Sequence, residues 1–391
     1  MGTFKITLKQ IGISLKILND CLEDEKYSIH SLITIILAVL VFISCTKLAY
    51  SSVDEIRLPN GFKIEEFASN LGSPRFMAFS PDDVLFVTII GKGTVVALPD
   101  KDKNGKTDKV ITFVKGLNHP HGIAFYKGYL YIGETNQIVR FKYQGFDSTP
   151  GKKEIIVPNL PARGHFTRTV GFGPDEKMYV SIGSSCNVCE EKDERRAAIL
   201  QFNPDGGEER VFAKGLRNSV GITWNPETKE LWATDNGRDW LGDNLPPEEI
   251  NIVKFEKHYG WPYCYGDRVP DPDFDTPDFC KKTTPPVFEM QAHSAPLGLT
   301  FYMGKLFPEE YQGDLIVAFH GSWNRSMPTG YKVVRIKMKN GKPQKIEDFA
   351  TGWLKGQRAW GRPVDLIVGP DGSLYVSDDK GGFIYRITVT K

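Results

Sequence analysis

The stretch GIAFYKGYLYIGE (Gly122–Glu134) joins a short apolar strand, a tight turn and a second strand, and its pattern recurs along the chain. Six copies are found: Phe76–Thr88, Gly122–Glu134, Thr169–Gly183, Gly221–Asp235, Gly298–Gly321 and Asp365–Asp379. They begin about 46, 47, 52, 77 and 67 residues apart. Because a propeller blade has four strands and roughly 40–50 residues, with insertions in loops, the repeats predict an all-β fold. We expect a six-bladed β-propeller of four-stranded antiparallel blades over residues 53–391.

Outer strands follow several copies of the repeat. They are Gln137–Phe141, Ala198–Phe202, Tyr331–Ile336 and Phe383–Ile387. The early strand FKIEEFA (Phe62–Ala68) has no blade of its own, so we expect it to complete the last blade and close the ring. No convincing helical pattern follows the N-terminal segment.

Composition agrees with this fold and narrows the function. Glycine (38 residues), proline (25) and aromatic residues (12%) suit many turns between short strands. The formal net charge is +1, without the basic excess of nucleic-acid-binding proteins, so we expect no nucleic-acid partner.

The N-terminal segment, residues 1–52, is predicted to be a signal peptide or a membrane anchor. Residues 31–44 are uncharged and apolar, but this run is shorter than the roughly 20 residues that a spanning helix needs. It fits the apolar core of a signal peptide, and Ala49 and Ser51 resemble a cleavage site. We therefore expect an exported protein, extracellular or periplasmic, whose N-terminal segment engages the membrane at least transiently. A retained anchor is the alternative to cleavage.

Four cysteines lie outside the N-terminal segment: Cys186, Cys189, Cys264 and Cys280. In an exported protein they predict two disulfides, and a zinc site formed by all four is the alternative. Haem attachment is excluded because Glu190 stands where a CxxCH motif needs histidine.

Cationic side chains occupy the same position in several repeats, just before the first strand. They are Arg75, His119, His121, His165, Arg168, Arg217, Asn218, His293 and Arg362, the asparagine being the one neutral member. In antiparallel blades these positions gather around one mouth of the central channel. A cationic pocket there predicts an anionic ligand.

Several segments resemble the glucose/sorbosone dehydrogenase family, and the resemblance runs from about Leu58 to Lys391. The segments are GHFTRTVGFGPDEKMYVSIG (Gly164–Gly183), GLRNSVGITWNP (Gly215–Pro226), EEINIV with HYGWP (248–262) and GRPVDLIVGPDGSLYVSDD (Gly361–Asp379). The HGSWNR stretch (His320–Arg325) is similar to the sorbosone and pyranose dehydrogenase branch. Members of the family are six-bladed propellers that use pyrroloquinoline quinone and calcium.

The resemblance implies a role for each matching residue. His165 matches the general base that takes the proton of the substrate hydroxyl while hydride passes to the quinone. Arg217 and Asn218 match a pair that contacts the cofactor, and Arg362 matches an arginine that binds a cofactor carboxylate. Arg168, at the same mouth, is assigned to the cofactor with them.

The same resemblance implies a calcium ion beside the quinone. The backbone carbonyls of Gly237 and Arg238 match the ligands of that ion, which acts as a Lewis acid. Soluble glucose dehydrogenases differ at three points. They carry a second arginine where this chain has Val364, an aspartate beside the histidine where it has Ser184, and a cofactor-binding lysine for which Arg325 is the candidate substitute.

A second calcium motif is independent of the family. Its oxygen ligands are Asp100, Asp102, Asn104 and Asp108, at the first, third, fifth and ninth positions, with glycine at the sixth. The bidentate glutamate of the twelfth position is replaced by Ile111. We expect a structural calcium there, and a plain solvated turn is the alternative.

We therefore predict a pyrroloquinoline-quinone-dependent dehydrogenase of an aldose, a sorbosone-like sugar or a related polyol. It would pass electrons to a separate acceptor, because the chain carries no haem motif. The alternatives are a metal-dependent propeller lactonase and a non-catalytic extracellular binding module. Trp323 and Trp360, near the binding face, are candidates for stacking on a sugar or the cofactor.

Overall fold

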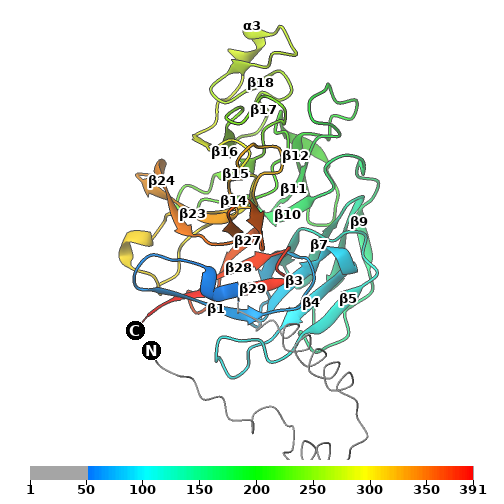
Figure 1. Ribbon diagram of the computed structural model, residues 1–391. Coiled ribbons are helices and arrows are strands. Elements are labelled where there is room, and N and C mark those ends of the chain that lie inside the picture. Colours follow the sequence, from blue (N-terminus) through cyan, green and yellow to red (C-terminus); the bar gives the residue numbers. More distant parts are fainter. Residues whose placement is uncertain (1–51, 391) are drawn as a thin grey trace, which may run out of the picture. The chain divides into compact units, whose positions relative to one another are not determined.

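The computed structural model describes residues 52–390, and its blades are antiparallel sheets (Figure 1). There are six blades of four antiparallel strands, and β17 (Lys257–His258) adds to the third sheet as a fifth strand, parallel to β13. The first blade contains β2 (Pro74–Phe79), β3 (Leu85–Ile89), β4 (Thr94–Leu98) and β5 (Ile111–Lys115). The second contains β6 (Ile123–Tyr126), β7 (Tyr129–Glu134), β8 (Gln137–Lys142) and β9 (Glu154–Val157). The third contains β10 (Arg168–Phe172), β11 (Met178–Ile182), β12 (Ala198–Phe202) and β13 (Arg210–Lys214). The fourth contains β14 (Ile222–Trp224), β15 (Leu231–Asp235), β16 (Glu248–Val253) and β20 (Phe288–Met290). The fifth contains β21 (Pro296–Phe301), β22 (Leu315–Phe319), β23 (Lys332–Lys339) and β24 (Lys342–Ala350). The predicted four-stranded blades are confirmed.

The sixth blade closes the ring. It contains β27 (Pro363–Val368), β28 (Leu374–Asp378), β29 (Phe383–Val389) and, as its outer strand, β1 (Phe62–Ala68). β1 pairs antiparallel with β29, so the expected closure by the early strand is confirmed. The innermost strands contact one another in the order β2, β6, β10, β14, β21, β27 and back to β2, which makes the propeller a closed ring.

Apolar side chains hold neighbouring blades together face to face. All five residues of β3 are buried, and so are those of β11, β15, β22 and β28. Between the first and second blades, for example, Phe86 and Val95 pack in one cluster with Leu130 and Ile132. Second strands covered on both faces read as nearly continuous apolar runs, which is why the repeats were visible in the sequence.

An insertion between β16 and β20 explains the longest spacing between repeats. It contains β17 (Lys257–His258), β18 (Cys264–Tyr265), β19 (Val269–Pro270) and the short helix α3 (Pro277–Cys280). A smaller hairpin, β25 (Leu354–Lys355) with β26 (Arg358–Ala359), lengthens the connection between the fifth and sixth blades. Single 3-10 turns lie at Ser52–Glu55, Ile90–Lys92 and Glu309–Tyr311.

The four cysteines form two disulfides, Cys186–Cys189 and Cys264–Cys280. This confirms the predicted disulfides and leaves no thiolates for a zinc site among these four. No helix within residues 52–390 is long and apolar enough to cross a membrane. The predicted signal or anchor segment, residues 1–52, lies outside the described residues except for Ser52.

Candidate active site

A cavity of about 440 Å³ lies at the mouth of the central channel. Five of the predicted cationic positions and Asn218 line it: Arg75, His165, Arg217, Asn218, His293 and Arg362. Residues that follow the second strands complete the wall: Asn236, Gly237, Asp239, His320, Trp323, Asn324 and Asp379. The volume falls in the range of roughly 300–1,000 Å³ typical of small-molecule sites.

His165 is held in one tautomer by the loop that follows β11. Its Nδ1 lies 3.0 Å from the carbonyl oxygen of Ser184 and 3.1 Å from Ser184 Oγ. The Ser184 hydroxyl donates its own proton to the Cys186 carbonyl at 2.6 Å, so Oγ accepts from the imidazole. Nδ1 therefore carries the proton, and Nε2 is left as a basic nitrogen in a residue that lines the cavity.

Burial lowers the pKa of His165 to about 4, and the charge of Arg217 contributes in the same direction. At neutral pH the imidazole is therefore uncharged and able to accept a proton. Ser184 stands where soluble glucose dehydrogenases carry an aspartate. Because it offers a carbonyl and a hydroxyl instead of a carboxylate, it orients His165 without adding negative charge.

Arg217 is fixed by the loop that the Cys186–Cys189 disulfide closes. Its Nε donates to the carbonyl of Asn187 at 2.9 Å, and its Nη2 donates to Asn187 Oδ1 at 3.0 Å. Nη1 donates to the carbonyl of Asn236 at 3.1 Å. The guanidinium thus has protein partners on all three nitrogens and presents a fixed positive charge at the cavity wall.

A network of opposite charges forms another side of the cavity. Asp379 accepts from Arg75 at 2.7 Å and from His320 Nε2 at 2.9 Å. Burial alone would raise the pKa of Asp379, but its bonds to His320 and Arg75 hold it well below its usual range. Burial lowers the pKa of His320 to about 4, so neutral His320 donates Nε2–H to the carboxylate. Arg75 also reaches His121 beneath the cavity, at 3.3 Å.

Arg362 extends this side of the cavity. Its guanidinium donates to the carbonyl oxygens of His320 and Gly321, each at 3.0 Å, and lies over the ring of Tyr331. No described carboxylate forms a salt bridge with it. Its charge is therefore offset less than that of Arg75.

This donor set fits a polyanionic cofactor such as pyrroloquinoline quinone. Arg75, Arg217 and Arg362 place three guanidinium groups around one cavity, and guanidinium is well suited to carboxylates. Nε of Arg75 is buried and has no hydrogen-bond partner among the described residues, a donor that a bound anion could satisfy.

Two buried carboxyl groups bind backbone N–H groups of the loops that carry Arg217, Asn218 and Gly237. Asp235 accepts the backbone N–H groups of Arg217 and Asn218 at 2.9 and 2.7 Å. Glu248 accepts those of Gly237 and Ala295 at 2.8 and 2.9 Å, joining two blades. Burial raises the pKa of both acids to about 7.

Gly237 lines the cavity, as expected for a ligand of the cofactor-site calcium. Within the described residues, its carbonyl oxygen and that of Arg238 accept no hydrogen bond, although Arg238 does not line this cavity. Asp239 and Glu248 line the same wall and place further carboxyl oxygens nearby. Oxygen donors of this kind suit calcium.

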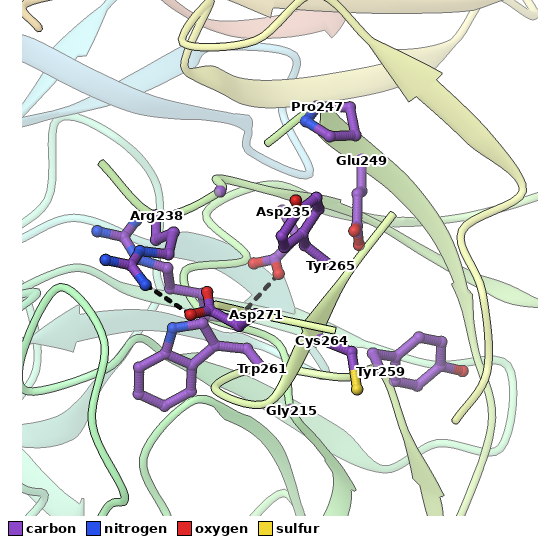
Figure 2. A pocket seen from close by; sticks show the side chains of 12 residues that line it. Gly215, Asp235, Arg238, Pro247, Glu249, Tyr259, Trp261, Cys264, Tyr265 and Asp271 are labelled. Atoms are coloured by element: carbon purple, nitrogen blue, oxygen red, sulfur yellow. Dashed lines mark hydrogen bonds and ion pairs between the residues drawn. The ribbon is translucent and has the colours of Figure 1, made fainter. Parts of the chain in front are cut away.

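The side chain of Arg238 points elsewhere. Its Nη1 pairs with Asp271 at 2.6 Å beside a second, much smaller cavity (Figure 2). That space of about 20 Å³, between Asp235, Glu249 and Trp261, has room for a water molecule and not for a cofactor.

Two predicted cofactor residues do not line the main cavity. Arg168 is fully buried and donates to the carbonyls of Pro161, His165 and Thr167, so it supports the His165 loop from below. Arg325, the candidate substitute for the family lysine, donates to the carbonyl of Ala292 and to Asn244 Oδ1, each at 3.3 Å. It ties two loops together at the rim.

The carboxylates of Asp100, Asp102 and Asp108 lie within 4.8 Å of one another, in the hairpin between β4 and β5. Asp100 accepts the backbone N–H groups of Asn104 and Gly105, and Asn104 Nδ2 donates to Asp102. The spacing brings three carboxylates together on an outer hairpin, far in the blade from the innermost strand. Calcium binding there stays a prediction.

One functional position, Asp379, was missed from the sequence. It comes directly after a second strand, as His320 and Asn236 do, and those strand ends share the cavity face. The loops that contain His320 and Asn236 are expected on this face by the repeat argument, and extending that argument to the second strand of the sixth blade would have found Asp379. His119 was expected at the mouth but is exposed and does not line the cavity.

Comparison with known proteins supports this interpretation. The profile of the TrAA12-like family matches residues 56–390. An uncharacterized protein of Borreliella burgdorferi is 34% identical over 381 residues, 93% of this chain and 98% of that protein. A pyrroloquinoline quinone-dependent pyranose dehydrogenase of Coprinopsis cinerea is 25% identical over 404 residues, 85% of this chain. The alignment covers 54% of the fungal protein, so the chain spans about half the length of that relative.

Solved structures share the fold. The holo form of the Coprinopsis cinerea pyranose dehydrogenase PQQ domain superimposes with a TM-score of 0.73 at 23% identity, covering 85% of this chain and 97% of that domain. A calcium structure of a Trichoderma reesei family AA12 enzyme gives 0.74 at 23% identity, covering 86% and 97%. The expected resemblance to quinone-dependent sugar dehydrogenases is confirmed, and the chain belongs to the TrAA12-like family.

Proposed function

We propose that the protein is a pyrroloquinoline-quinone-dependent dehydrogenase that oxidises an aldose, a sorbosone-like sugar or a related polyol. The observation that carries the proposal is His165, a neutral histidine with an available Nε2 in a cavity lined by three arginines. Two relatives with a stated activity, a pyrroloquinoline quinone-dependent pyranose dehydrogenase and an aldose sugar dehydrogenase, support sugar oxidation.

In this mechanism a C–H bond and an O–H bond of the substrate break and a C=O bond forms. His165 Nε2 accepts the hydroxyl proton, and Ser184 keeps the imidazole oriented by holding Nδ1–H. A bound quinone would supply the hydride acceptor, and a bound calcium ion would supply a Lewis acid. Arg75, Arg217 and Arg362 would hold the cofactor carboxylates, with Asn218 beside them, and the carbonyls of Gly237 and Arg238 would bind the calcium. The two electrons would leave to a separate electron acceptor.

Export is part of the proposal. Two disulfides in one chain suit an oxidising compartment, extracellular or periplasmic. Residues 1–52 would direct the chain to the membrane.

The test is a titration of the apoprotein with pyrroloquinoline quinone and calcium, followed by reduction of an artificial dye with a panel of aldoses. We expect calcium-dependent uptake and dye reduction, and a 10²–10⁴-fold loss of kcat in His165→Gln with the uptake retained. His119→Gln is the matched control, because His119 is exposed and lies outside the cavity wall. Absence of uptake at micromolar quinone would reject the dehydrogenase in favour of a binding module. Hydrolysis of lactones without quinone would favour the lactonase.

A further inference from the structure

Two tryptophans at the rim of the cavity are exposed to solvent. The described chain contains all seven tryptophans of the sequence, and only Trp240 and Trp323 are exposed, each with 67% of its surface accessible. Trp323 lines the cavity, and Trp240 lies beside it with the ring centroids 5.2 Å apart and the planes at 88°. In this edge-to-face arrangement the two rings form an open corner. Exposed aromatic surface next to a binding cavity indicates a contact site.

The loops under both tryptophans are tied together. Trp240 follows β15 and Trp323 follows β22. Between the loops, Ser326 N–H donates to Asp243 at 2.9 Å and Arg325 donates to Asn244 at 3.3 Å. His293 Nε2 lies 2.8 Å from the carbonyl of Gly242. The tryptophans therefore sit on a connected base that holds their spacing without burying them.

Trp240 adopts a backbone conformation that disfavours bulky side chains. Its φ is 73°, in the left-handed region, where a residue with a large side chain is an outlier. Neither burial of the indole nor a hydrogen bond to it offsets this cost in the described structure. Strain held at the rim of a functional cavity points to a role in binding.

We propose that Trp240 and Trp323 form an outer sugar subsite that binds the pyranose ring next to the one being oxidised. The preferred substrate is then an aldose that carries further rings, an oligosaccharide oxidised at its chain end; this deepens, and rests on, the proposed dehydrogenase function. A pyranose ring has apolar C–H faces that pack on an indole, while its hydroxyls around the edge stay in water.

The contrast between the cavity and its rim supports this division. The wall holds Arg75, Arg217 and Arg362, which suit an anionic cofactor. The two indoles at the rim are uncharged and aromatic, which suits a neutral ring. Asn324, next to Trp323, lines the cavity, and its amide Nδ2 has no partner within residues 52–390. It is placed between the two regions and has a free donor for a hydroxyl.

Binding is tested first without the cofactor. Tryptophan fluorescence of the apoprotein is titrated with glucose, maltotriose and cellotriose, and with xylose and xylotriose. We expect at least one trisaccharide to bind about tenfold more tightly than its own monosaccharide, and this gain to disappear in Trp240→Ala and Trp323→Ala. If every trisaccharide binds no better than its monosaccharide, the subsite does not exist. The readout needs no quinone, so it stands even when the dehydrogenase proposal fails.

Kinetics provide the second arm, on the quinone-loaded enzyme. The ratio of kcat/KM for the trisaccharide to that for the monosaccharide should fall about tenfold in Trp240→Ala and recover largely in Trp240→Phe. Phe255→Ala is the matched control: Phe255 is also an exposed aromatic, 42% accessible, and lies outside the cavity wall. An unchanged ratio overturns the subsite. A second outcome also overturns it: Trp240→Ala reduces a protein acceptor such as cytochrome c more slowly, while its dye kinetics are unchanged and the enzyme shows no trisaccharide preference. That result would assign the two tryptophans to binding the electron acceptor.

Discussion

His165 should remain a working base far below the pH at which histidine ordinarily titrates. Burial and the charge of Arg217 lower its pKa to about 4. At pH 5 such a group is about nine-tenths unprotonated, whereas a histidine with the usual pKa of about 6.5 is only about 3% unprotonated. Because the base acts in its neutral form, kcat/KM at pH 5 should stay near its plateau, about 30-fold above the value for an unperturbed histidine.

The assay has two parts. The pH dependence of kcat/KM is measured from pH 3.5 to 8 on the quinone-loaded enzyme, with a dye acceptor that does not titrate in that range. The imidazole of His165 is then titrated by NMR in the apoprotein, where no cofactor charge acts on it, and its signal is assigned with His165→Gln. Activity should fall only as the pH drops through the region of 4. An apparent pKa near 6.5 in the apoprotein would refute the reasoning, because burial and Arg217 would then have no effect.

Three further results are expected. Asp379→Ala should lower the free energy of unfolding by about 3–5 kcal/mol, measured with urea, because it strands the mostly buried charge of Arg75; a loss under about 1 kcal/mol would show that the pair is solvated. Millimolar calcium should raise the Tm of the apoprotein more than that of Asp102→Ala, and equal shifts would leave the outer hairpin as a plain turn. Replacing Cys264 and Cys280 by serine should cost about 3 kcal/mol, since the disulfide spans a separation of 16 residues, and an unchanged urea midpoint would contradict the expectation.

The fold was predictable because each blade repeats one local pattern. Second strands such as Leu85–Ile89 are buried on both faces, so their apolar runs stand out in the sequence. The closing strand Phe62–Ala68 could be placed because the sixth blade was the only one that lacked its outer strand. The insertion between β16 and β20 could not be given a shape, since its short strands lack a repeating pattern.

The site was predictable only to the level of position along the strand. Arg168 and Arg362 occupy equivalent positions in their repeats, at the start of an innermost strand. The structure turns one guanidinium under the loop of His165 and leaves the other at the cavity wall. This difference depends on which carbonyls each side chain reaches, and those come from other blades or from neighbouring loops. The pairing of Arg75 with Asp379, more than 300 residues apart, likewise exists only in the closed ring.

Closure by β1 and β29 sets an order of assembly. Synthesis makes Phe62–Ala68 first and Phe383–Val389 last, with nearly the whole propeller between them. A growing chain can form its early blades one after another, but β1 has no partner until the final strand is made. Until then its unpaired edge is open to contacts with other strands, other copies of the chain included. Arg362 and Asp379 flank strands of this sixth blade, so the cavity also becomes complete only after that blade has been made.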